Sequence, residues 1–206
     1  MNIQSKTIKI EYSCINKWID NSSTVLDLGC GNGELLSLLI NQKQVKAQGI
    51  EIDEQAIYQC VARGISVFHE DLDNGLKGYL NKSFDYVILY QTLQQVKKMD
   101  KVLSEALRVG KKVIIALPNF AFYKARLQII FRGRVPVTAS LPFQWYDTPN
   151  LHFLSIYDFI DYCNIRKIKI EKSVFFNENK TVKVFPNLFA ENAIFLLSKS
   201  DQPDAD

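Results

Sequence analysis

The stretch Val25-Leu-Asp-Leu-Gly-Cys-Gly-Asn-Gly-Glu-Leu-Leu36 decides how this 206-residue chain folds. Its first four residues form a largely apolar run, which is typical of a buried parallel strand. Three glycines follow at alternate positions, Gly29, Gly31 and Gly33, and the apolar run over 34–40 predicts a helix. A strand, a glycine turn and a helix in this order bring backbone N–H groups to the start of a helix, where a ligand can lie against the main chain.

The composition favours one folded domain. Hydrophobic residues make up 47% of the chain and the net charge is only +3, with Lys and Arg spread along the sequence. This gives no reason to expect nucleic acid or a membrane as a partner. The four cysteines have no Cys-x-x-Cys spacing, which disfavours a metal site. Because the chain begins without the apolar region of a signal peptide and has no membrane-length apolar run, we expect a cytoplasmic protein.

Strand and helix patterns alternate up to Pro118. Helices are expected over 8–19, 34–40, 54–63 and 100–109, the last with Asp100 as its N-cap and Gly110 as its stop. The expected strands are 25–28, 47–51, 65–69, 84–89 and 113–117. This alternation predicts a doubly wound, Rossmann-like α/β sheet that is mostly parallel.

The regular alternation of strand and helix patterns ends at Pro118. We expect a helix over 120–131, an irregular segment over 132–151 and a helix opened by the capping box Ser155-x-x-Asp158. Two last strands, 167–176 and 192–198, should pair antiparallel at one edge and complete a seven-stranded sheet. The expected organisation is therefore one domain over 1–199, with an aromatic and basic insertion at about 120–151 and a disordered tail over 200–206.

Acidic side chains end two of the strands, and ligands of such sheets bind outside the carboxyl ends of the strands. Glu51 ends the second strand, 20 residues after Gly31, where a carboxylate can accept hydrogen bonds from a ribose diol. Asp71, followed by Leu72, ends the third strand. Its carboxylate suits the amino group of an adenine, but it could instead cap the next helix. Ile52 would pack on the adenine face.

Two adenosine ligands compete for this turn. A dinucleotide requires Gly-x-Gly-x-x-Gly, but the third glycine would fall at Glu34, whose carboxylate would repel a pyrophosphate. Asp27 can instead accept from an ammonium group, and the turn amides can bind a carboxylate. S-adenosylmethionine (SAM), an adenosine that carries an amino acid, fits this arrangement. Tyr90, at the end of the fourth strand, is either a lid over the methionine part or a packing aromatic.

A family resemblance supports the same ligand. The turn over 27–33, with Gly49-Ile-Glu-Ile-Asp53 and Phe84-Asp-Tyr-Val-Ile-Leu89, resembles class I SAM-dependent methyltransferases. More narrowly, the chain resembles the MetW family of methionine biosynthesis over roughly residues 8–175, most specifically in Gln144-Trp-Tyr-Asp-Thr-Pro-Asn150. The resemblance implies a bacterial cytosolic protein that binds SAM or S-adenosyl-L-homocysteine. It also implies work beside MetX, the homoserine O-acyltransferase, which carries the acyl transfer in that family.

Candidate catalytic residues are few, so two functions stay open. The two histidines, His69 and His152, are both expected to pack, and Tyr90-Gln-Thr-Leu93 stands where amino methylation commonly uses an Asn/Asp-Pro-Pro-Tyr turn. The first function is a SAM-binding accessory partner of MetX, with SAM as an effector. The second is an active small-molecule methyltransferase. The aromatic and basic residues of 120–151 would form a partner surface in the first case and roof a substrate pocket in the second.

Overall fold

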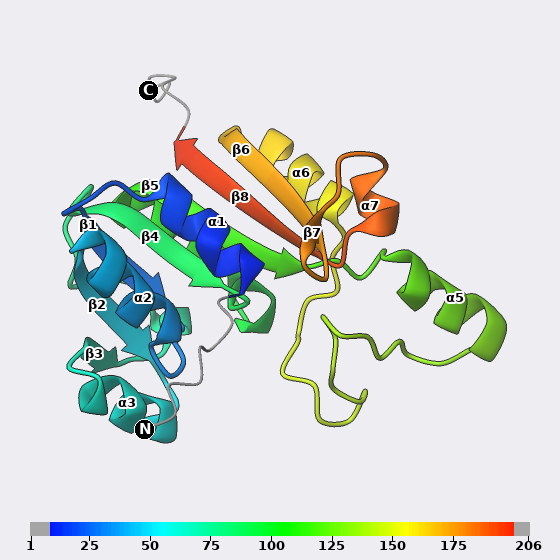
Figure 1. The fold of residues 1–206 in the computed structure, drawn as a ribbon, viewed down its shortest axis with the longest axis horizontal. Coiled ribbons are helices and arrows are strands. Elements are labelled where there is room, and N and C mark those ends of the chain that lie inside the picture. Colours follow the sequence, from blue (N-terminus) through cyan, green and yellow to red (C-terminus); the bar gives the residue numbers. More distant parts are fainter. Residues whose placement is uncertain (1–8, 200–206) are drawn as a thin grey trace, which may run out of the picture.

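One mixed sheet carries the fold in the computed structural model, which describes residues 9–199. Its strand order is β3-β2-β1-β4-β5-β8-β6-β7, and the first five of these strands are parallel (Figure 1). β8 runs antiparallel between β5 and β6. The strands are β1 (Thr24–Leu28), β2 (Lys46–Glu51), β3 (Ser66–His69), β4 (Phe84–Tyr90), β5 (Gly110–Pro118), β6 (Ile168–Asn177), β7 (Lys180–Thr181) and β8 (Asn192–Lys199).

The predicted doubly wound sheet is confirmed, with one strand more than expected. β6 and β8 pair antiparallel at one end of the sheet, as the sequence indicated. The eighth strand, β7, contributes two residues that pair with the end of β6. A two-residue strand has no alternation to detect, so the sequence pattern could not show it. The tail over 200–206 lies outside the described residues.

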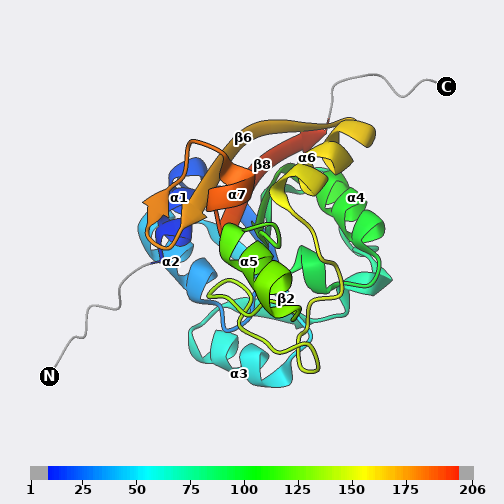
Figure 2. The same ribbon diagram turned by 90° about the vertical axis from the view of Figure 1, so that its right-hand side faces the viewer.

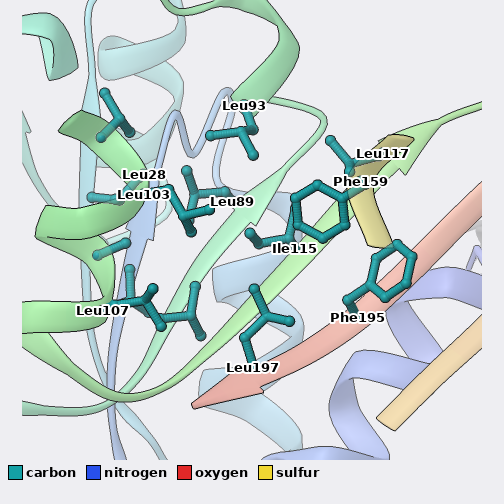
Figure 3. Packing of buried hydrophobic residues seen from close by; sticks show 14 of the residues in the cluster. Leu28, Leu89, Leu93, Leu103, Leu107, Ile115, Leu117, Phe159, Phe195 and Leu197 are labelled. Carbon is teal, nitrogen blue, oxygen red and sulfur yellow. The ribbon is translucent and has the colours of Figure 1, made fainter. Parts of the chain in front are cut away.

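Helices cover both faces of the sheet (Figures 1 and 2). Side chains of α4 and α6 pack on one face in a cluster that includes Leu28, Leu89, Ile115 and Phe195 (Figure 3). Side chains of α1 and α2 pack on the other face. The helices are α1 (Ile10–Trp18), α2 (Glu34–Lys43), α3 (Glu54–Ala62), α4 (Met99–Val109), α5 (Tyr123–Arg132), α6 (Ile156–Ile165) and α7 (Pro186–Phe189), with short 3₁₀ turns η1 (Leu72–Asn74) and η2 (Leu93–Gln95).

Two of three expected helix caps are confirmed. Ser155 and Asp158 form the reciprocal capping box of α6, and Gly110 follows the last residue of α4. Asp100 is not the N-cap of α4, because that helix begins one residue earlier. The carboxylate of Asp73 accepts from the backbone N–H groups of Lys97 and Lys98 at 3.1 and 2.7 Å, and these bonds hold the chain in place just before the helix begins.

The segment 120–151, which we call the arm, leaves the body beyond β5 and carries α5 outward (Figures 1 and 2). From 133 to 155 the chain forms turns and bends without a helix or strand, as predicted. The two ends of the arm are held together, because the N–H of Phe120 donates to the carbonyl of Leu154 at 3.1 Å. Within residues 9–199, no helix is long and apolar enough to cross a membrane, and no group of acidic, histidine or cysteine side chains is placed to hold a metal ion.

Candidate functional site

The glycine turn joins β1 to α2 at the carboxyl edge of the parallel sheet. Gly29, Gly31 and Gly33 all have positive φ angles, of 73°, 53° and 75°. Residues other than glycine rarely adopt such angles. The N–H groups of Gly29 and Cys30 both donate to the carbonyl of Ile50, at 2.8 and 3.1 Å. The turn is therefore anchored to β2, the strand that ends in Glu51.

Only one of the three glycines faces open space. A Cβ atom at Gly29 would lie 2.7 Å from the side chain of Thr92, and one at Gly33 would lie 2.9 Å from the sulfur of Cys60. A Cβ atom at Gly31 would meet no atom of residues 9–199 within 4 Å. Gly29 and Gly33 are thus required by internal packing as well as by φ, while Gly31 is the position where a ligand has room to approach the main chain.

Asp27 is the most unusual charged residue of the site. Alternation along β1 turns its side chain to the face covered by α1 and α2, and the residue is only 2% exposed. Its Oδ1 atom is fully buried and has no hydrogen-bond partner among the described residues. Burial, and secondly the charge of Glu51, raise the pKa of this carboxyl to about 7. Such an acceptor is costly to leave unpaired, so a donor from outside the chain would stabilise it.

Glu51, the acid that the sequence places at the tip of the second strand, lies directly against the glycine turn. Its Oε2 accepts from the N–H of Gly31 at 2.7 Å, and its Oε1 accepts from the N–H groups of Ile52 and Asp53 at 2.8 and 3.0 Å. The carboxylate therefore joins the tip of β2 to the one glycine that faces open space. Its role toward a ribose stays a prediction.

The residues expected around an adenine lie beyond Glu51. Ile52 is 60% exposed, so an apolar surface is left uncovered beside the carboxylate. Asp71 is exposed, and its Oδ1 accepts from the N–H of Asp73 at 2.9 Å, which makes it the N-cap of η1. Leu72 is half-buried against the core. The alternative of Asp71 as a helix cap is thus realised, and its role toward adenine, with those of Ile52 and Leu72, stays a prediction.

Two tyrosines close the α1 side of the site. The rings of Tyr90 and Tyr12 meet edge to face with 5.0 Å between their centroids. Burial raises the pKa of both hydroxyls, and the charges of Asp27 and Glu34 add to the rise at Tyr12. Tyr12 therefore lies near the turn, although the sequence pattern indicated only that it is an apolar position of a helix. The role of Tyr90 as a lid stays a prediction.

A polar network at the tip of β4 was not expected from sequence. Gln91 has a φ of 58°, a left-handed conformation that is unusual for a side-chain-bearing residue. The side-chain amide of Gln94 donates to the carbonyl of Gln91 at 2.9 Å, while its buried Oε1 has no partner within the described part of the chain. The side chain of Asn192 connects Gln91 to Glu11, at 3.3 and 3.1 Å. These residues come from distant parts of the sequence, so no local sequence motif predicts that they lie together.

The two histidines differ in position. His69 is exposed, so the expectation that it packs is wrong, because β3 is an edge strand with little of the protein beyond it. His152 is half-buried, and its Nε2 lies 2.9 Å from the carbonyl of Val96, which confirms its structural packing. The backbone N–H groups of Leu151 and His152 also donate to the carbonyl of Gln94, at 2.9 and 3.0 Å. The end of the arm is thus bound to the tip of β4.

Comparison with known sequences gives two findings. The family model described as "Methionine biosynthesis protein MetW" matches residues 9–197. A protein of Rhodopirellula baltica, named bifunctional methionine biosynthesis protein MetXA/MetW, is 32% identical over 209 residues. That alignment covers 95% of this chain and 34% of the relative, so the chain spans about a third of the length of the curated relative it matches.

Two solved structures resemble this chain at low sequence identity, so they bear on the fold alone. A SAM-dependent methyltransferase from Archaeoglobus fulgidus has a TM-score of 0.68 at 17% identity, over 92% of this chain and 93% of that one. A SAM-dependent methyltransferase from Thermotoga maritima, described as a possible histamine N-methyltransferase, has a TM-score of 0.66 at 18% identity, over 92% and 88%. The chain thus has the fold of these methyltransferases.

Proposed function

This chain belongs to the family of methionine biosynthesis protein MetW, and from that membership we propose that it binds SAM at the glycine turn and serves as an accessory partner of a homoserine O-acyltransferase. The observation that supports the ligand best is the buried carboxylate of Asp27, whose Oδ1 has no partner among residues 9–199. An ammonium group would supply both the missing hydrogen bond and the counter-charge.

The other residues of the turn fit the rest of SAM. The backbone N–H groups of the glycine turn, with open space at Gly31, suit the carboxylate of the amino-acid part. Glu51 suits the ribose, the exposed side chain of Ile52 suits the adenine face, and Asp71 beside Leu72 suits the adenine amino group. Tyr90 would border the methionine part. When bound, SAM supplies an electrophilic methyl group if it acts as a methyl donor. If it acts as an effector, it stabilises the conformation that binds it and no methyl group is transferred.

Glu51 suggests that binding changes the turn. A carboxylate has about four lone-pair positions, and three backbone N–H groups already occupy most of them. A ribose diol brings two further donors, so one existing bond has to lengthen or break. The bond from Gly31 is the one that a ligand lying on the turn would replace, and its loss would let the turn adapt to the amino-acid part.

The partnership is supported by the relative and by the arm. The name of the Rhodopirellula baltica protein joins MetXA and MetW in one polypeptide, of which this chain covers about a third. We infer that the present chain contacts a homoserine O-acyltransferase in the bacterial cytoplasm, through residues 120–151. We also infer that residues 1–199 act as one domain, with the arm as its insertion.

A second candidate function is methyl transfer to a small molecule. The observation that favours it is the buried Oε1 of Gln94, which has no partner in the described chain and lies at the tip of β4, where enzymes of this fold often handle the methyl acceptor. A polar acceptor with an N–H or O–H group would satisfy this oxygen. Transfer of labelled methyl from SAM to a metabolite pool, without a complex with the acyltransferase, would favour this function over the first.

Calorimetric titration with SAM tests the ligand proposal directly. We expect one SAM per chain, and we expect Asp27→Asn to weaken binding by at least 30-fold, because removal of one partner of a buried charge pair costs about 2–5 kcal/mol. Glu70→Gln removes an exposed carboxylate that we place outside the site, and it should leave the affinity unchanged. Absence of binding at millimolar SAM by the wild-type chain would contradict the proposal.

A further inference from the structure

The arm displays apolar side chains that the rest of the described chain, residues 9–199, leaves exposed. Within α5 and its N-cap, only Phe122 and Ala125 are buried. Leu127, Ile130 and Phe131 lie at positions i, i+3 and i+4 of the helix, share one side of it and are exposed, with Phe131 at 79%. Single exposed apolar residues are common on protein surfaces, but a cluster on a protruding helix marks a binding surface.

The arm presents these side chains in a fixed arrangement. The side-chain amide of Gln128 donates to the carbonyl of Val137 at 2.9 Å and accepts from the N–H of the same residue at 3.1 Å. Thr138 and Leu141 exchange backbone hydrogen bonds at 3.0 and 3.2 Å. The loop is thus fastened back onto α5. A surface that is ordered before binding loses less conformational entropy when a partner arrives.

A groove beside α5 adds a place for a partner's side chain. It has a volume of about 420 Å³ and is lined by Lys124, Leu127, Gln128, Phe131 and Arg132. Apolar and cationic side chains therefore share one side of the helix. A helix that lies on a membrane keeps its apolar and basic residues on opposite faces. The mixed lining instead favours a protein surface that offers both an apolar contact and carboxylates.

The charge of the arm narrows the choice of partner. Residues 120–151 contain four Lys and Arg residues and a single acidic residue, Asp147, which lies outside α5. In a symmetric contact with a second copy, the arm would meet the same positive charges, and this repulsion disfavours self-association through α5. A different protein with an acidic rim around an apolar groove would be complementary.

We propose, resting on the partnership argued above, that α5 inserts its Leu127, Ile130 and Phe131 face into an apolar groove of the homoserine acyltransferase. Phe131 is the central anchor, because it is the most exposed large apolar side chain of the helix. Carboxylates on the groove's rim pair with Lys124 and Arg132. Apolar side chains of the partner enter the 420 Å³ groove that these cations border. This is the helix-in-groove mode of recognition.

The test measures the affinity of the full chain and its variants for the purified acyltransferase of the same organism by analytical ultracentrifugation. Phe131→Glu should weaken the complex at least 30-fold, because it places a charge in the centre of the apolar contact. Leu80→Glu is a matched control, since Leu80 is also 79% exposed but lies in the loop before β4. It should change the affinity less than twofold. Arg132→Glu should weaken the complex at least fivefold and reduce its salt dependence.

The outcomes separate this surface from the partnership. Equal affinities for wild type and Phe131→Glu would overturn the docking surface and leave the partnership standing. No complex with the wild-type chain would overturn both, whatever the result of the SAM titration. Binding of the chain to phosphatidylglycerol vesicles that is lost in Phe131→Glu, with acyltransferase binding unchanged, would assign the helix to membranes and also overturn the proposal. Thermal unfolding of each variant checks that it is folded, and if Phe131→Glu is not, Arg132→Glu decides.

Discussion

The glycine turn and the arm are incomplete in opposite ways. The turn buries a carboxylate, Asp27, that has no counter-charge among residues 9–199, while the arm leaves apolar side chains such as Phe131 exposed. Each arrangement is unfavourable for the isolated chain, since an unpaired buried acceptor and an uncovered apolar surface both cost free energy. What is missing differs in kind. A small cationic ligand would complete the turn, and only a macromolecular surface would complete the arm.

The two regions are also physically connected. The carbonyl of Gln94, at the tip of β4, accepts from the backbone N–H groups of Leu151 and His152 at the end of the arm. Thr92, from the same tip, packs against Gly29 of the turn. Occupation of one site could therefore affect the other through a few contacts. This is the geometry that an effector role of SAM needs, and separate measurements on the two regions can test it.

The largest expected effect concerns Asp27 and pH. Its carboxyl has a pKa of about 7 in the folded chain and near 3.8 in the unfolded chain, so between these pH values the folded chain holds more protons and its stability falls as pH rises. The ionised group costs up to about 4 kcal/mol above pH 7. We expect Asp27→Asn to flatten this fall in the ligand-free chain, measured by urea unfolding at pH 5 and pH 8. A wild-type stability equal at both pH values would show that Asp27 is not a buried unpaired acid.

SAM provides the internal control for that experiment. Because its ammonium group would favour the ionised carboxylate, saturating SAM should raise the unfolding free energy of the wild-type chain more at pH 8 than at pH 5. The Asp27→Asn chain should gain little at either pH. A gain of equal size in both chains would place the ligand away from Asp27.

A smaller effect is expected when a glycine of the turn and a glycine of the arm are each replaced by alanine and the losses in unfolding free energy are compared. In the turn, Gly33→Ala forces a Cβ to within 2.7 Å of Ile65 and 2.9 Å of Cys60 at a φ of 75°, which should cost about 2–4 kcal/mol. In the arm, Gly133 has a φ of 57°, but a Cβ there would meet no described residue within 4 Å, so Gly133→Ala should cost only about 1 kcal/mol. Chemical unfolding measures both. Equal costs would mean that the turn is no more tightly packed than the arm.

The sequence predicted the turn much better than its surroundings. The sequence placed the glycine turn after the first strand and Glu51 at the end of the second, because strand patterns and glycine turns are local signals, but it did not predict their 2.7 Å hydrogen bond. Asn192 and Tyr12 reach the same edge only through long-range packing, which no local pattern encodes. His69 was misplaced for a related reason, since a strand's position at the edge of the sheet is a tertiary property. The aromatic residues of the arm were recognised from sequence, but their exposure depends on how the arm leaves the body.

The smallest expected effect is also the sharpest test of the arm. Phe131→Ala should change the free energy of unfolding of the isolated chain by no more than about 0.5 kcal/mol, because an exposed side chain loses little packing and alanine favours the helix. The truncation of a phenylalanine buried in the core typically costs about 3–5 kcal/mol. Urea unfolding without a partner makes the measurement. A loss above about 2 kcal/mol, well beyond the usual surface range, would mean that Phe131 packs within its own chain. The arm would then be complete by itself, and its contrast with the glycine turn would disappear.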